Sequence, residues 1–104
     1  MTEYLVYMTV KSEEEATRIG TELIEQRLAA CANIIGTSKS FFWWNGVVQS
    51  GSESVIILKT SDNKIDLLIS TAQELHSYDC PAIVAIEIKK GNPDFLEWIS
   101  KEIP

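Results

Sequence analysis

The sequence predicts an α+β protein of the split βαβ, or ferredoxin-like, class. Three observations predict it: strand and helix patterns alternate as β-α-β twice, an Asn45-Gly46 turn joins the two halves, and 104 residues suit one domain. In this class two helices cover one face of a four-stranded antiparallel sheet. We therefore expect a single domain over residues 1–104 whose other sheet face is bare.

The first half of the chain has the pattern of a strand, a helix and a long second strand. Residues 3–10 (EYLVYMTV) are apolar and rich in β-formers, which predicts a buried strand. Ser12 and Glu15 have the spacing of a capping box and predict the start of a helix near residues 13–30. Apolar residues recur at helical spacing: Ala16, Ile19, Gly20, Leu23, Ile24 and Leu28. The second strand is expected over residues 32–44 (ANIIGTSKSFFWW).

The second half repeats this plan after the turn. A third strand is expected over residues 47–60, with Gly51 as a candidate bulge. Ser61 or Asp62 is expected to cap a second helix. Its buried side is predicted to hold Ile65, Leu68, Ile69, Ala72 and Leu75. The fourth strand is expected over residues 82–90.

A short third helix is predicted near the end of the chain. Asn92 suits the N-cap position, and Pro93 suits the first helical position because its missing N–H would have no partner there. The apolar residues of this helix are Phe95, Leu96, Trp98, Ile99 and Ile103.

The long hairpin is expected to overhang the helices. A helix over residues 13–30 is ~27 Å long at ~1.5 Å per residue, whereas the third strand would extend ~45 Å at ~3.3 Å per residue. Alternate residues of the run FFWW point to opposite faces. Across the turn, Trp44 is expected opposite Val47. Trp43 is expected opposite Val48. We expect one of these pairs to pack inside the protomer and the other, which we take to be that of Trp44, against a neighbouring copy.

Composition and charge exclude several classes of protein. The formal net charge of −6 disfavours nucleic acid and anionic membranes as partners, because both attract basic surfaces. No apolar run is long enough to cross a bilayer. Cys31 and Cys80 form no disulfide framework, and free thiols suit a reducing compartment. The N-terminal stretch lacks the pattern of a secretion signal, so we expect a cytoplasmic protein.

Several strings together resemble one known family. They are RLAACANII (27–35), FFWWNG (41–46), ILKTS (57–61), HSYDCP (76–81) and FLEWI (95–99), in the order and spacing of the CutA divalent-cation tolerance proteins. The resemblance covers essentially the whole chain. It implies a tight homotrimer in which the sheets face a common axis and the hairpins embrace neighbouring subunits. It also implies no enzymatic activity, a link to copper and other divalent metals, and a similarity in architecture to the PII signalling proteins.

The resemblance also implies positions for copper ligands. They fall on Met8, Leu75 and His76, where the family has a cysteine and two histidines. Of these three ligands only one histidine, His76, is kept. At Met8 a thioether replaces the thiolate of the family's cysteine, and Leu75 replaces the other histidine. The sequence therefore predicts no certain cofactor, and at most a weak site for Cu(II) or another divalent metal at His76, with help from Met8, Asp79 or Cys80. In the alternative, His76 simply ends the second helix.

A cleft between subunits is the second candidate site. Lys59 closes an otherwise apolar strand and is expected beside Trp44 and Tyr78, where it would attract a small anionic molecule. Its alternative role is a strand-end lysine that extends to water. Cys31 is a further cleft candidate, although its apolar neighbours favour a buried role. Candidates for the trimer interface are Phe42, Trp43, Trp44 and Trp98.

The predicted function is that of a non-enzymatic trimer, associated with divalent-metal tolerance, which binds metal or a small effector weakly. The alternative is a PII-like sensor that binds an anionic effector or a partner protein at its clefts. The tight Asn45-Gly46 turn counts against this alternative, because PII proteins have a long loop there. Two departures from the family pattern, Ser77 for a proline and Ala82 for a glutamate, weaken any inherited ligand site.

Overall fold

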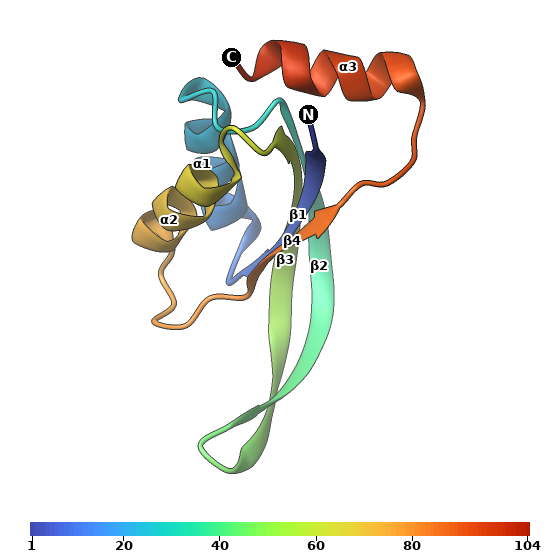
Figure 1. The fold of residues 1–104 in the computed structure, drawn as a ribbon. Coiled ribbons are helices and arrows are strands. Elements are labelled where there is room, and N and C mark those ends of the chain that lie inside the picture. Colours follow the sequence, from blue (N-terminus) through green and yellow to red (C-terminus); the bar gives the residue numbers. More distant parts are fainter.

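The computed structural model describes residues 1–104 and has the predicted split βαβ plan (Figure 1). Its elements are β1 (Glu3–Val10), α1 (Glu13–Glu25), β2 (Cys31–Trp44), β3 (Val47–Ser61), α2 (Ile65–Leu75), β4 (Ile83–Glu87) and α3 (Pro93–Glu102). The strands form one antiparallel sheet in the order β2-β3-β1-β4. This order confirms the predicted fold class, with the long hairpin at one side of the sheet.

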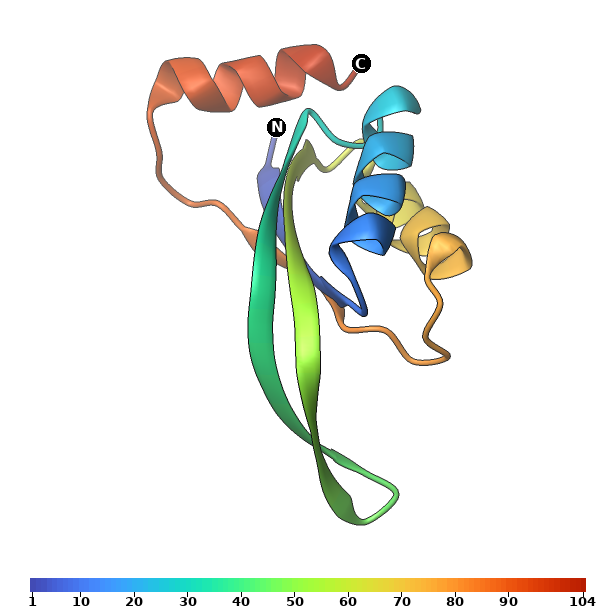
Figure 2. The ribbon, with the colours of Figure 1, turned by 180° about the vertical axis from the view of Figure 1, so that it is seen from behind.

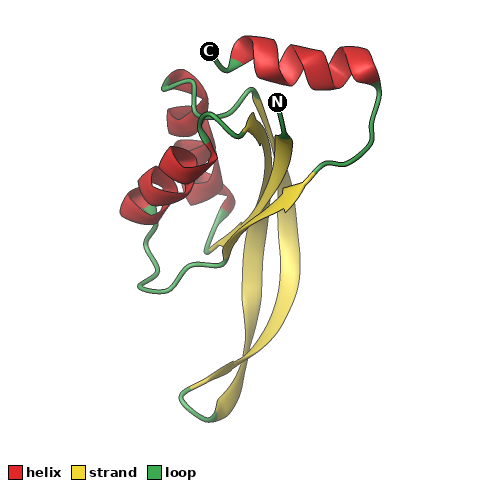
Figure 3. Cartoon of the chain, in the orientation of Figure 1, coloured by secondary structure: helices red, strands yellow, loops and turns green.

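One face of the sheet and the helices α1 and α2 enclose the hydrophobic core (Figures 2 and 3). Alternate residues of β1 and β3 point into it, because side chains on a strand alternate between faces. The strand residues of the core are Val6, Met8, Val10, Ile56 and Leu58, all without solvent exposure. The helices contribute Ala16, Ile19, Leu23, Leu68 and Ala72. The predicted apolar sides of both helices are thus the ones that the structure buries.

The opposite face of the sheet, which we call the bare face, has no helical layer over most of its length. Its exposed apolar side chains are Tyr7, Ile35, Val84 and Ile86. Only α3 lies against it, across the end of the sheet near the N-terminus (Figure 1). There Ile99 and Ile103 are buried, and the Ser100 hydroxyl donates a hydrogen bond of 2.6 Å to the Glu3 carboxylate. The expected bare face is therefore present.

The hairpin of β2 and β3 extends well beyond the helices and curls at its tip (Figure 3). Asn45 and Gly46 have φ values of 51° and 77°, as a type I′ turn requires. The predicted pairs Trp44–Val47 and Trp43–Val48 are present. The expectation that one pair packs inside the protomer is wrong, because Trp43 is 73% exposed and Trp44 52%. Beyond the body the hairpin has no second layer on either face, so neither tryptophan is enclosed.

Helix α1 ends at Glu25, five residues earlier than predicted. The amide of Leu28 bonds to the Leu23 carbonyl at 2.9 Å, and that of Arg27 to the Ile24 carbonyl at 3.0 Å, which is a Schellman motif. The residue in the left-handed conformation is Arg27, with φ 59°, where glycine is usual. The sequence did not predict the end of α1 at Glu25 because no glycine closely follows it. Leu28 is nevertheless buried, since the turn folds it back onto the core.

Helix α2 begins at Ile65 with Lys64 as its N-cap, so the prediction of Ser61 or Asp62 as cap is wrong. Ser61 is still part of β3, opposite Glu3, and the Asp62 amide bonds to the Thr2 carbonyl at 2.9 Å. Pairing with β1 therefore extends β3 through the residues that resembled a helix start.

Two further details differ from prediction. The irregular step in the hairpin lies between Ile35 and Ser38 of β2, whereas Gly51 pairs regularly with Ser40. Strand β4 covers only Ile83–Glu87, instead of residues 82–90. The two strands β1 and β4 are antiparallel, with Glu87 opposite Tyr4. Because β1 begins at Glu3, it has almost no residue left to pair with β4 beyond Glu87.

Candidate functional site

A cleft of about 1110 Å³ lies on the bare face, between the curved hairpin and the loop that follows α2. We call it the hairpin cleft. Its aromatic side chains include Tyr7, Phe42, Trp44 and Tyr78. Its ionisable side chains include Lys39, Glu53, Asp79 and Cys80. The structure thus brings Trp44 and Tyr78 to one cleft within a single chain, whereas the cleft expected from the sequence lies between subunits.

A hydrogen bond between Tyr78 and Glu53 joins the two sides of this cleft. The Tyr78 hydroxyl donates to the Glu53 carboxylate at 2.9 Å. Burial, and then this hydrogen bond, raise the pKa of Tyr78 to about 12, so the phenol keeps its proton at neutral pH. No cation pairs with Glu53, since the two ion pairs of the chain are Arg18–Glu15 and Arg27–Glu102. The cleft therefore holds a carboxylate whose charge the chain leaves unpaired.

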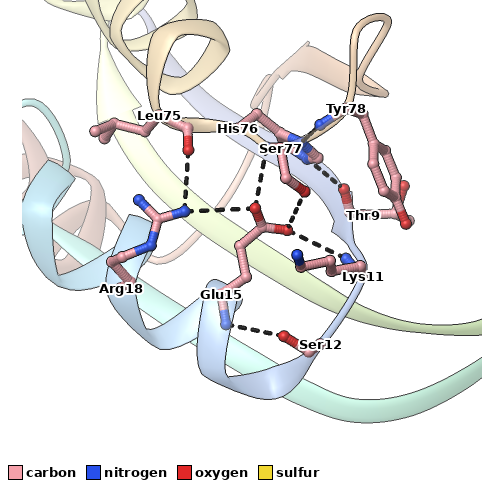
Figure 4. Close-up of polar contacts among 9 residues, drawn as sticks. All are labelled: Thr9, Lys11, Ser12, Glu15, Arg18, Leu75, His76, Ser77 and Tyr78. Atoms are coloured by element: carbon pink, nitrogen blue, oxygen red, sulfur yellow. Dashed lines mark hydrogen bonds and ion pairs between the residues drawn. The ribbon is translucent and has the colours of Figure 1, made fainter.

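The loop that lines the cleft is held by Glu15 of α1 (Figure 4). The buried Glu15 carboxylate accepts hydrogen bonds of 3.0 Å from both the amide and the hydroxyl of Ser77. It also accepts from the Lys11 amide at 3.4 Å and pairs with Arg18 at 3.4 Å. Burial by itself would raise the pKa of Glu15, but the hydrogen bonds from Ser77 and Lys11 outweigh it and lower the pKa.

The predicted capping box is therefore only half formed. The Ser12 hydroxyl accepts a hydrogen bond of 3.1 Å from the Glu15 amide, as expected. The Glu15 side chain, however, turns to Ser77 instead of the Ser12 amide. This contact joins residues 62 positions apart and could not be read from local spacing.

His76, the candidate metal ligand, uses both of its ring nitrogens in hydrogen bonds (Figure 4). Nδ1 accepts from the Tyr78 amide at 3.0 Å and so carries no proton, which leaves Nε2 to donate to the Thr9 carbonyl at 2.8 Å. The ring is 8% exposed and packs against Tyr78 at 4.8 Å between ring centroids. This arrangement fits the alternative in which His76 ends the second helix and holds the following loop.

The other proposed metal ligands do not complete a site with His76. Met8 is fully buried in the core between the sheet and the helices. Asp79 and Cys80 are exposed in the loop. No three His, Cys, Asp or Glu side chains lie close enough to hold a metal ion. The residues present therefore do not fit the copper site that the family resemblance implies.

Lys59 and Cys31 lie elsewhere on the bare face and do not line the cleft that holds Trp44 and Tyr78 of the same chain. They are cross-strand partners, and the Lys59 ammonium donates a hydrogen bond to the Asn33 side chain. Lys59 is six residues from Glu53 along β3, or ~20 Å at ~3.3 Å per residue. Within one chain, Lys59 is therefore absent from this cleft. The ionisable residues of the cleft that sequence reasoning missed are Lys39 and Glu53. The only sequence signal of Glu53 is a single carboxylate in SGSESVII on the same strand face as Ile57.

The candidate interface aromatics occupy three separate surfaces. Phe42 and Trp44 line the hairpin cleft, whereas Trp43 points to the other side of the hairpin. Trp98 stacks on Phe95 of α3, with 5.7 Å between ring centroids. All are at least 40% exposed.

The fold is that of a small α+β protein of the split βαβ class. Its exposed features are the apolar bare face, the aromatic hairpin and the hairpin cleft. The chain belongs to the CutA1 divalent ion tolerance protein family, whose model matches residues 4–102. Membership in this family of tolerance proteins agrees with the prediction that the chain is not an enzyme.

Similar proteins match nearly the whole chain. The divalent-cation tolerance protein CutA of Archaeoglobus fulgidus is 42% identical over 98 residues, which are 94% of this chain and 95% of that protein. A solved structure from that organism, described as periplasmic, has a TM-score of 0.93 at 40% identity and covers 98% of this chain and 99% of its own. The CutA1 structure from Oryza sativa has a TM-score of 0.95 at 36% identity, covering 100% of this chain and 95% of its own.

The relatives differ in length and in the compartment that their names give. The chloroplastic CutA 1 protein of rice is 39% identical over 95 residues, which are 91% of this chain but 54% of that protein. This chain therefore spans about half the length of the plant relative. None of the helices α1, α2 and α3 combines the length and the apolar content that a membrane span requires. The cytoplasmic location remains a prediction.

Proposed function

We propose that this protein acts in divalent-cation tolerance as a homotrimer assembled through its bare face. The observation that carries the proposal is the exposed apolar surface, with Tyr7, Ile35, Val84 and Ile86 all at least 38% exposed. Large contiguous apolar surfaces on a single chain usually mark contacts with other molecules. Apart from α3 at one end, the chain has no element that covers this surface.

The two edges of the sheet support closed assembly. Strand β2 on one side and β4 on the other have partners along only one edge. Unpaired edges invite pairing with other chains, and a closed ring of copies removes them. In our proposal the hairpin of each copy reaches its neighbour, so Phe42, Trp43 and Trp44 lose water contact there. Trp98 on α3 is the fourth candidate for this interface.

The metal role that we propose does not depend on a tight copper site at His76. Both nitrogens of His76 have partners, and Met8 is enclosed in the core. Weak binding of Cu(II) through the exposed Asp79 and Cys80 is the arrangement that these positions allow. Calorimetric titration with Cu(II) is expected to give weak binding that His76→Ala leaves unchanged and Cys80→Ser reduces. Tight binding that His76→Ala abolishes would contradict this proposal.

Two experiments test the proposed function. Sedimentation at micromolar concentration is expected to give a trimer, and a stable folded monomer would contradict the assembly. Expression in a metal-sensitive bacterial strain that lacks its own CutA protein is expected to restore growth in added copper. A trimeric protein that fails to restore growth in copper, zinc or cobalt would contradict the tolerance role alone.

The PII-like alternative is favoured by one observation, the hairpin cleft with its aromatic and ionisable side chains. The short Asn45-Gly46 turn still counts against a loop that binds a partner protein. The charges of the cleft also disfavour the anionic effector of that hypothesis, because Glu53 and Asp79 outnumber Lys39 among its ionised side chains.

A further inference from the structure

Glu53 of the hairpin cleft has one hydrogen-bond partner in its own chain and no counter-charge. It is half-buried on β3, and its carboxylate accepts the Tyr78 hydroxyl at 2.9 Å. The phenol keeps its proton at neutral pH, so it holds the carboxylate in place without neutralising it. Neither ion pair of the chain includes Glu53. Our proposed assembly covers this face, and a carboxylate that loses water there without a counter-charge would destabilise the contact.

The geometry of a ring limits which side chain of a neighbouring copy can meet Glu53. A closed ring joins the β2 edge of one copy to the β4 edge of the next, so its axis runs roughly along the strands. Rotation about such an axis keeps every residue at its own height, and neighbours therefore meet at similar heights. Glu53 lies where the hairpin leaves the body of the sheet, because the last residue of β1, Val10, is opposite Ser54 (Figure 1).

One of the nine lysine and arginine residues of the chain lies on the hairpin at this height. It is Lys39 of β2, which is exposed and pairs with Ser52, the residue before Glu53. The two arginines are already in ion pairs, and Lys11 lies beside Glu15 at the start of α1 (Figure 4). The other lysines lie toward the end of the sheet that carries α3: Lys59, Lys64, Lys89, Lys90 and Lys101.

A bulge in β2 turns Lys39 away from Glu53 of its own chain. The register shifts between Ile35 and Ser38, where β2 has one residue more than β3. Below this step Ser38 is opposite Glu53, and both point to the bare face. Because side chains alternate along a strand, Lys39 points to the opposite face of the hairpin, which we call the outward face. The outward face of one copy is thus the face that can present Lys39 to another copy.

We propose that the hairpin cleft binds the outward face of a neighbouring copy's hairpin, and that Lys39 of this neighbour is the counter-ion of Glu53. The inference rests on the proposed assembly and specifies one contact within it. The outward face also carries Phe41 and Trp43, which are 70% and 73% exposed in one chain and suit the aromatic walls of the cleft. Each copy offers one cleft and one outward face, so identical contacts close the ring.

Charge reversal in the full chain tests this pair. Lys39→Glu and Glu53→Lys are each expected to raise the trimer dissociation constant by about 100-fold or more, because each places like charges in the contact. The chain with both reversals is expected to return to within about tenfold of the unmodified chain. Sedimentation across a dilution series measures the constants. Circular dichroism establishes that each variant is folded, as expected for two residues outside the core.

The matched controls are reversals on α2, which lies on the helix-covered side of the sheet. Lys64→Glu and Glu74→Lys change the net charge by the same amounts as the two test variants. Each is expected to change the trimer dissociation constant by less than about threefold, because an exposed charge remote from the contact contributes little. Effects as large as those of the hairpin variants would show that net charge, and not this pair, controls assembly.

Mixing the two single variants distinguishes a contact between copies from one within a chain. The Lys39→Glu chain and the Glu53→Lys chain present opposite charges to each other wherever they are neighbours. The mixture is therefore expected to form trimers at concentrations at which neither variant does so alone. An ion pair within one chain would not be restored by mixing, so recovery in the double variant without recovery in the mixture would overturn the proposal.

The remaining outcomes separate this contact from the assembly itself. An unmodified chain that is a folded monomer at micromolar concentration would contradict both. A trimer whose dissociation constant is unchanged by Lys39→Glu and by Glu53→Lys would contradict only the contact. A folded double variant that stays dissociated would show that Lys39 and Glu53 do not meet each other.

Discussion

Two neighbouring isoleucines on β3 show how differently the two faces of one sheet are used. Ile56 points to α1 and α2 and has no solvent exposure, whereas Ile57 points to the bare face and is only half-buried. The same residue type in the same strand thus contributes to the core at one position and to an open surface at the next. The helix-covered face is complete in one chain, and in our proposal the bare face is completed by other copies.

The largest expected effect tests this comparison directly. Ile56→Ala is expected to lower the free energy of unfolding by roughly 2–5 kcal/mol, because it leaves a cavity in the core. Ile57→Ala is the matched control. It is expected to weaken the contact between copies, so its unfolding should depend more strongly on protein concentration than that of the unmodified chain. Urea unfolding at several concentrations measures both. Equal, concentration-independent losses in the two variants would mean that the two faces do not differ as we argue.

The second prediction concerns Glu15, which connects the helix-covered side to the loop of the hairpin cleft. Glu15→Gln replaces a buried acceptor of four contacts with a neutral amide, so we expect a loss of roughly 1–3 kcal/mol. Ser12→Ala removes only the helix cap and serves as the control, with a loss of about 1 kcal/mol. Thermal or urea unfolding at neutral pH measures the difference.

The same carboxylate predicts a dependence on pH. The folded pKa of Glu15 lies below its ordinary value of 4.5, so its contribution is complete above that value and is lost as the pH falls through the folded pKa. Unfolding free energy measured between neutral and strongly acidic pH is expected to fall less steeply in Glu15→Gln than in the unmodified chain. Parallel curves would show that Glu15 does not carry this dependence.

A third prediction compares the two faces of the hairpin. Trp44 lines the cleft on the bare-face side, and Trp43 points the other way and is more exposed. We expect Trp44→Ala to raise the trimer dissociation constant by about tenfold or more, equivalent to ~1.4 kcal/mol, and Trp43→Ala to change it less. Sedimentation across a dilution series decides between them. The reverse order would place the principal contact on the other side of the hairpin.

The smallest expected effect is that of Ser77→Ala. It removes the hydroxyl contact to Glu15 and keeps the amide contact, so a loss of about 0.5–1.5 kcal/mol is expected. Ser77→Pro also removes the amide, and should cost more. If Ser77→Pro is as stable as the unmodified chain, the amide contact contributes little to holding the loop.

Local patterns in the sequence were sufficient for most of the elements. The Asn45-Gly46 turn, the Asn92-Pro93 helix start and the alternation in β1 and β3 each predict the observed structure, because each depends on the residue's own geometry. The end of α1 was misplaced because Arg27 takes the position where a glycine would have given a signal. The start of α2 was misplaced because Ser61 continues its pairing with β1.

The sequence by itself determined the class of the fold, the bare face and the overhanging hairpin, since these follow from periodicity and from the lengths of the elements. Only the tertiary structure decided the composition of the site. It brought Tyr78 to Glu53 and Ser77 to Glu15, and it separated Lys59 from both. The physical reason is that these contacts join residues far apart in the chain, and neither propensity nor spacing carries information about which distant side chains will meet.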